Sequence, residues 1–205
     1  MMKLETKHIL PALVIFFLLT VTAKADIYEW PNENTHIGFY EELMASSKIP
    51  VDADIYLDLN NKRGDCDGVD TLGATTNVFY YANPNDENSL TAYPDKFFVC
   101  LANSNWNKYV SKRLVFMHEI GHIHAALTDY GKSYEKFYKI MQKSKGWEPL
   151  NVINLVEYYA DAFAWCSTSA PFAWKRGKKY DEKYSFVYWP TKKEHKLICK
   201  KVFAA

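Results

Sequence analysis

Hydrophobic and polar positions along the chain follow two different periods, and the change between them falls near residue 108. Before it, residues 54–58 alternate polar and apolar side chains, which is typical of a short strand. Residues 75–81 are rich in β-branched and aromatic side chains and residues 97–101 are apolar, so both segments predict strands. Residues 39–46 predict a short helix.

Beyond residue 108 the apolar positions recur with the period of a helix. Asn151 is a suitable N-cap for one of these helices. With 205 residues, the chain is long enough for one domain and too short for two full ones, and we expect an α+β fold. The predicted elements are helices over residues 108–127, 133–144 and 151–167, a strand over residues 184–189 and a short helix after Thr191.

The first 25 residues have the pattern of a signal peptide. Lys3 and Lys7 precede an apolar run over residues 9–21, and Ala23-Lys24-Ala25 then has the small-x-small form that a signal peptidase accepts. A run of about 13 residues is short beside the roughly 20 that a bilayer span needs. We expect cleavage after Ala25, which leaves a single domain over residues 26–205; an uncleaved anchor is the alternative.

The charge of the chain gives no reason to expect a nucleic-acid partner. The leader takes three lysines and one glutamate from the 25 basic and 24 acidic residues, which leaves 22 and 23 and a formal charge of −1. Such a chain has no global field that attracts nucleic acid. No second membrane-length apolar run follows the leader, so we expect a soluble monomer without stable membrane insertion.

All four cysteines lie in the part that is expected to be exported. An even count in an exported chain predicts two disulfides, for which three pairings exist. The pairs Cys66–Cys100 and Cys166–Cys199 close the two shortest loops and are the pairs we expect. No two cysteines have the C-x₂₋₄-C spacing of zinc ligands, so we interpret them as covalent crosslinks.

The strongest chemical signal is the motif His118-Glu119-Ile120-Gly121-His122. On a helix, residues i and i+4 are about 40° apart around the axis and about 6 Å apart along it, so the two imidazoles can chelate one metal ion. Glu119 is displaced by about 100° and can reach a metal-bound water without being a ligand. This is the H-E-x-x-H arrangement of zinc metallopeptidases. The alternative is a pair of core histidines beside a paired glutamate, but polar groups in so apolar a helix are costly unless something satisfies them.

Glu157 and Asp161 are the candidates to complete this site. A catalytic zinc site has three protein ligands and one position left for water. The two acids lie at i and i+4 on the third predicted helix, so Glu157 can point at the zinc ion while Asp161 accepts the free ring N–H of a zinc-bound histidine. An ordinary helix with two solvated acids fits poorly, because the surrounding residues leave little polar face.

The H-E-x-x-H motif followed by E-x-x-A-D-x-F-A at residues 157–164 resembles the gluzincin metallopeptidases, and is most similar to their CAAX-protease-like and ImmA/IrrE-like branches. The resemblance covers about residues 74–167. It implies a zincin-like fold, with a small mixed or antiparallel sheet packed on an active-site helix and a glutamate-bearing helix. It also implies that Glu157 is the third ligand, that Asp161 supports a ligand, and that the strand at 75–81 or 97–101 is the edge strand that pairs with an extended substrate.

The chain departs from the intracellular branches in its leader and its cysteines, and it lacks the continuation found in metzincins, so His124 is not expected to be a ligand. The chemistry requires one zinc ion per chain, with Glu119 as general base and a further donor for the oxyanion. The side chains of Tyr158, Tyr159, Tyr188 and His195 are chemically able to donate, and we take His195 as the candidate.

We therefore expect a secreted or periplasmic zinc metalloendopeptidase that hydrolyses peptide bonds in extended protein or peptide segments. Two alternatives stay open. One is a catalytically inactive, metallopeptidase-like interaction protein, against which the presence of Glu119 argues, since binding alone does not require it. The other is a zinc amidase that acts on a cell-wall substrate.

Overall fold

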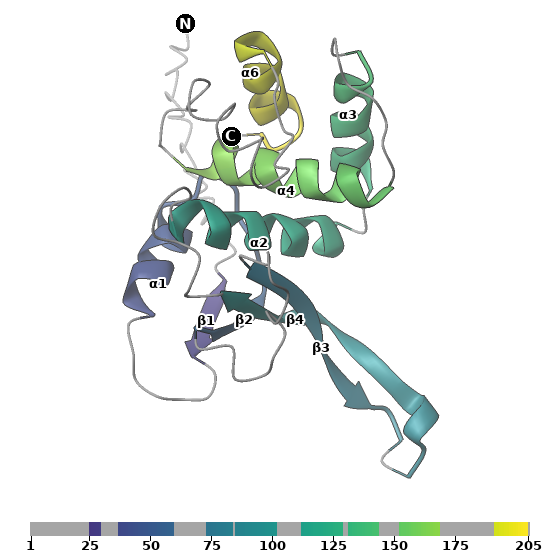
Figure 1. Cartoon of the computed structure of the whole chain (residues 1–205). Coiled ribbons are helices and arrows are strands. Elements are labelled where there is room, and N and C mark those ends of the chain that lie inside the picture. Colours follow the sequence, from purple (N-terminus) through teal and green to yellow (C-terminus); the bar gives the residue numbers. More distant parts are fainter. Residues whose placement is uncertain are drawn as a thin grey trace, which may run out of the picture.

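The structure is a computed structural model, and it describes residues 25–29, 37–59, 73–83, 85–101, 112–128, 131–143, 152–168 and 191–204. In this part of the chain one four-stranded mixed sheet lies beneath stacked α-helices, and a further helix, α1, flanks the sheet (Figure 1). The prediction of a mixed sheet combined with helices is confirmed. The elements are β1 (Asp26–Glu29), α1 (Gly38–Ala45), β2 (Asp54–Asp58), β3 (Gly73–Tyr81), a 3₁₀ turn (Glu87–Ser89), β4 (Leu90–Leu101), α2 (Lys112–Leu127), α3 (Lys132–Met141), α4 (Val152–Ser167) and α6 (Lys192–Lys201).

The strands of the sheet follow the order β1-β2-β4-β3. β1, β2 and β4 are parallel, and β3 is antiparallel to β4. Among the described strands β3 therefore lies at an edge of the sheet. This agrees with one of the two alternatives from the sequence, in which residues 75–81 form the edge strand. The other alternative, residues 97–101 as the edge strand, is wrong because β4 is hydrogen-bonded to β2 on one side and to β3 on the other.

Two features of the sheet were not predicted. β1 begins at Asp26, directly after the predicted cleavage site. β4 begins at Leu90, well before residue 97, and its first half pairs with the end of β3 as a two-stranded ribbon that projects from the body of the protein (Figure 1). Pro94 lies where the register between the two strands shifts, and a break in the ladder tolerates a residue that has no N–H to donate.

The helices form successive layers above the sheet. α2 packs on β3 and β4, α4 packs on α2, and α3 and α6 pack on α4 (Figure 1). The glutamate-bearing helix α4 thus reaches α2 from the side away from the sheet, whereas the sequence analysis expected both helices on the sheet. α2 is covered from two sides, which explains why apolar residues are found all around it.

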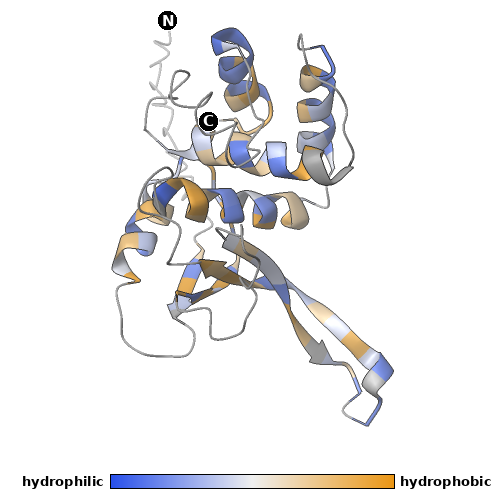
Figure 2. Cartoon of the chain, viewed as in Figure 1, coloured by the Kyte–Doolittle hydropathy of each residue, from blue (hydrophilic) through white to orange (hydrophobic). Residues whose placement is uncertain are grey.

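One hydrophobic core runs from the sheet through α2 to α4. Figure 2 shows apolar residues in the short strands and in α2 and α4, while the outer helices α3 and α6 carry more hydrophilic residues. No helix in the described part of the chain combines the length and the apolar character that crossing a membrane requires. Fully buried side chains of this core include Ile55, Leu57, Phe97, Phe116, Ile120, Ile123, Tyr159 and Phe163.

The predicted helices are confirmed within a few residues at their ends. α6 begins after Thr191, whose side chain and that of Glu194 form a reciprocal capping box. The disulfide Cys166–Cys199 is confirmed and joins α4 to α6. Cys100 is also disulfide-bonded. Outside the described residues lie residues 1–24 of the leader, Cys66, Asn151, Tyr188 and the strand predicted at residues 184–189.

Candidate metal centre

Helix α2 presents two histidines on one face, at the side that meets α4. His118 and His122 are one turn apart, and their ring centroids are 4.8 Å apart with nearly perpendicular planes. Their Nε2 atoms lie 3.1 Å from each other. His118 is buried and His122 is partly exposed. The two rings therefore turn the same nitrogen toward one point.

Glu157 brings a carboxylate from α4 to this point. Its Oε2 lies 3.1 Å from Nε2 of His118, and its Oε1 lies 3.5 Å from Nε2 of His122. Ligand atoms of all three residues lie within 4.8 Å of one another. A tetrahedral zinc ion with bonds of about 2.0–2.1 Å separates its ligand atoms by about 3.3 Å, so the spacing fits a single zinc ion.

Asp161 holds the remaining ring nitrogen of His118. Nδ1 of His118 donates to Oδ1 of Asp161 over 2.7 Å, and both side chains are buried. In the neutral tautomer that this bond selects, Nε2 carries a lone pair and no proton. That lone pair faces the lone pairs of Glu157 and His122, an arrangement that a cation between them satisfies.

The electrostatics of the group favour positive charge at the same place. Burial lowers the pKa of His118, but the hydrogen bond and charge of Asp161, the hydrogen bond to Glu157 and the charge of Glu119 outweigh it and hold the pKa well above its usual value. Burial raises the pKa of Glu157, but the two histidines outweigh it and hold the pKa well below its usual range. The group thus offers an ionised carboxylate beside two imidazoles, which attracts a proton or a metal ion.

Gly121 explains how α4 comes close enough for Glu157 to reach α2. A Cβ at this position would lie 2.7 Å from Cα of Ala160 and 2.9 Å from its carbonyl oxygen. Only a glycine permits this approach of the two backbones. Gly121 and Ala160 are positions of the two sequence motifs, but the motifs do not predict this contact.

Glu119 lies beside the start of the edge strand rather than among the three converging residues. Its carboxylate is buried and accepts a hydrogen bond from the Thr75 hydroxyl over 2.7 Å. A Cβ at Gly73 would lie 2.6 Å from its Oε1. β3 therefore positions the carboxylate of Glu119, and no local pattern predicts the contact because the partners are 44 residues apart.

His124, Tyr159 and His195 make contacts outside the group of three. His124 contacts the Tyr159 hydroxyl over 3.0 Å within an aromatic cluster that includes Phe163 and Phe203, and burial lowers its pKa to about 4. Tyr158 is buried. His195 lies on α6 in a separate cluster with the Cys166–Cys199 disulfide, so the structure does not bring it into the group of three.

Comparisons with protein-family models, with curated proteins and with solved structures find no match to this chain.

Proposed function

We propose that this protein is an exported, zinc-dependent peptidase in which His118, His122 and Glu157 hold one zinc ion and Glu119 acts as the general base. The observation that carries the proposal is the spacing of 3.1–3.5 Å among two imidazole nitrogens and one carboxylate, with a second carboxylate fixing the ring of His118. Two imidazoles and a carboxylate are the ligand set of several catalytic zinc sites.

The exposure of the group suits catalysis better than a purely structural site. The side chain of Glu157 is 51% exposed and that of His122 is 19% exposed, so water and substrate can reach the group. Structural zinc sites use four protein ligands, whereas three converge here among the described residues. A zinc ion bound at such a site lowers the pKa of its water and polarises a carbonyl group.

Two observations support Glu119 as the general base. It is on the same helix as the two histidines, it is not one of the three converging residues, and the Thr75 hydroxyl fixes its carboxylate. From there it takes the proton of the attacking water and transfers it to the leaving amine. The edge strand that holds Thr75 is paired on one side only among the described strands, so its outer edge suits an extended peptide.

The test uses purified protein, with zinc per chain and the hydrolysis of unfolded casein as readouts. Glu119→Gln keeps the shape of the side chain and removes its basicity, and we expect the rate to fall by about 10²–10⁴-fold with zinc binding retained. The matched control is Glu135→Gln, an exposed glutamate on α3, which should leave the rate unchanged. Equal rates for Glu119→Gln and wild type would end the assignment of the base. Zinc binding without hydrolysis by the wild type would favour the interaction protein instead.

A further inference from the structure

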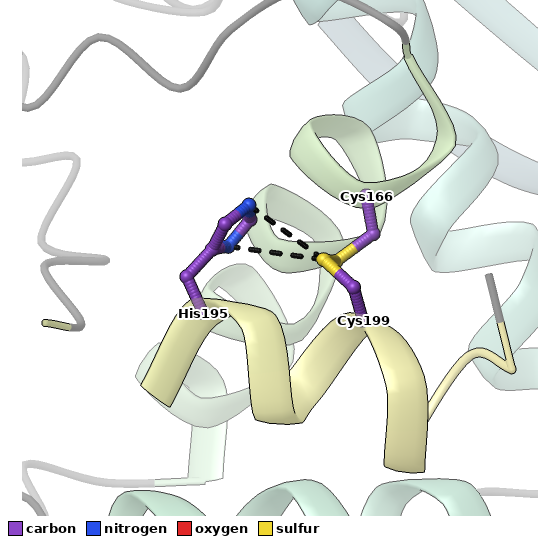
Figure 3. Close-up of side chains that lie close together, drawn as sticks. All are labelled: Cys166, His195 and Cys199. Atoms are coloured by element: carbon purple, nitrogen blue, oxygen red, sulfur yellow. Dashed lines mark hydrogen bonds between the residues drawn. A yellow bond between two sulfur atoms is a disulfide. The ribbon is translucent and has the colours of Figure 1, made fainter. Parts of the chain in front are cut away.

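A second cluster of metal-ligating side chains lies at the junction of α4 and α6 (Figure 3). Cys166, near the end of α4, forms a disulfide with Cys199 of α6. His195 is one turn before Cys199 on the same helix and turns its ring toward the sulfur, with Nε2 at 3.6 Å and Nδ1 at 3.9 Å. Cys166 and His195 are buried, and Cys199 is partly buried.

One sulfur-to-nitrogen distance in this cluster matches a zinc site that has both kinds of ligand. With bonds of about 2.3 Å to sulfur and about 2.0–2.1 Å to nitrogen, tetrahedral zinc separates a sulfur ligand from a nitrogen ligand by about 3.6 Å. The distance from Nε2 of His195 to Sγ of Cys199 is 3.6 Å. We propose that reduction of the Cys166–Cys199 disulfide creates a second metal site, in which two thiolates and the His195 imidazole bind a zinc ion.

The chemistry balances with a dithiol as the reductant. The dithiol supplies two electrons and two protons and becomes a disulfide, while the Cys166–Cys199 bond opens to give two thiols. On binding Zn²⁺ both thiols release their protons to solvent. His195 needs no deprotonation at neutral pH, because burial lowers its pKa and leaves the imidazole neutral.

The site would keep α6 attached to α4 when the covalent bond is absent. α4 also carries Glu157 and Asp161, and Phe203, just beyond α6, packs on Tyr159 and Phe163 of α4. Helix α6 is then attached to the glutamate-bearing helix α4 by a disulfide under oxidising conditions and by zinc under reducing conditions. This inference does not depend on the proposed peptidase function.

The first test counts metal ions with Co²⁺ as the probe. The full chain is studied oxidised, and again after reduction with a phosphine, which carries no thiol. Thiolate-to-cobalt charge transfer reports sulfur ligands, and the His118 group contains none. We expect reduction to add one cobalt ion per chain together with this absorption band, whether or not the oxidised protein already binds one. The same stoichiometry and no band after reduction would overturn the inference.

The second test identifies the ligands. Zinc should slow alkylation of Cys166 and Cys199 in the reduced protein and leave the alkylation rates of Cys66 and Cys100 unchanged; equal protection of all four, or of none, would overturn the inference. Groups that only support a metal ligand change affinity by about 10–100-fold, so His195→Gln, which removes a ligand, should weaken this site by at least about tenfold. Lys196→Gln, at an exposed neighbouring position, is the matched control.

Reduction can also unfold the chain, and near-ultraviolet circular dichroism detects this. In that case zinc must restore the folded spectrum of the reduced wild type, and must fail to do so in a Cys166→Ser, Cys199→Ser double variant. If zinc does not restore the wild-type spectrum, or restores both spectra equally, the proposed site does not exist.

Discussion

The replacement Gly121→Ala tests how the two helices position the metal ligands. The added methyl group would meet backbone atoms of Ala160 at 2.7 and 2.9 Å, and backbone atoms cannot rotate out of the way. Raising 2.7 Å to the 3.4 Å at which ordinary contact begins requires α4 to move away by about 0.7 Å. Glu157, one turn before Ala160, would move with it.

The expected effect on stability is a difference between two contributions. Forcing a methyl group into a packed contact costs about 1–3 kcal/mol. Alanine is favoured over glycine inside a helix by about 0.8–1.0 kcal/mol, which offsets part of this cost. The metal-free variant should therefore be less stable than wild type by about 0–2 kcal/mol.

The effect on zinc binding should be larger than the effect on stability. Metal–ligand distances tolerate deviations of about 0.2 Å, and a shift of about 0.7 Å exceeds this several times. We expect zinc affinity to fall by at least about tenfold, measured by competition with a chromogenic chelator. Gly38→Ala is the control, because a Cβ at Gly38 meets nothing within 4 Å. If Gly121→Ala binds zinc as tightly as Gly38→Ala, the close helix contact does not position Glu157.

Three further predictions test single contacts. Asp161→Asn removes the charge that supports His118 and should weaken zinc binding by about 10–100-fold in the same competition assay; unchanged affinity would contradict the supporting role. Thr75→Val removes the hydroxyl that bonds Glu119 and should slow casein hydrolysis while leaving zinc content unchanged; parallel loss of both would mean that Thr75 acts on the whole site. Burial lowers the pKa of His195, so the folded state binds this proton less readily than the unfolded state, and stability should decline as the pH falls below about 6.5. His195→Gln should reduce this decline in acid titrations of unfolding, and an identical decline in the variant would assign it to other groups.

The sequence predicted the candidate site best where residues of the site lie one turn apart on the same helix. The i and i+4 spacing of the histidines on α2, and of Glu157 and Asp161 on α4, predicts shared faces that the structure also has. The spacing of residues within each helix does not predict the angle or the distance at which α2 and α4 cross. The role of Gly121 depends on which backbone lies opposite, and that is decided by packing.

The predictions were wrong or incomplete where contacts between segments far apart in the sequence determine the structure. The first half of β4 contains Pro94 and polar residues, and only its pairing with β3 makes it a strand. Spacings between the cysteines alone do not predict that His195 and Cys199 share a face of α6 and that Cys166 lies close to them. Local patterns carry no information about such contacts.

X-ray absorption spectroscopy of the oxidised, zinc-loaded protein reports the elements bound to the metal, and so shows whether two imidazoles and a carboxylate hold it. We expect one zinc ion per chain with only nitrogen and oxygen neighbours at about 2.0–2.2 Å, including the multiple-scattering pattern of two imidazoles. A protein that retains no zinc, or zinc with sulfur at about 2.3 Å in the oxidised state, would contradict this expectation.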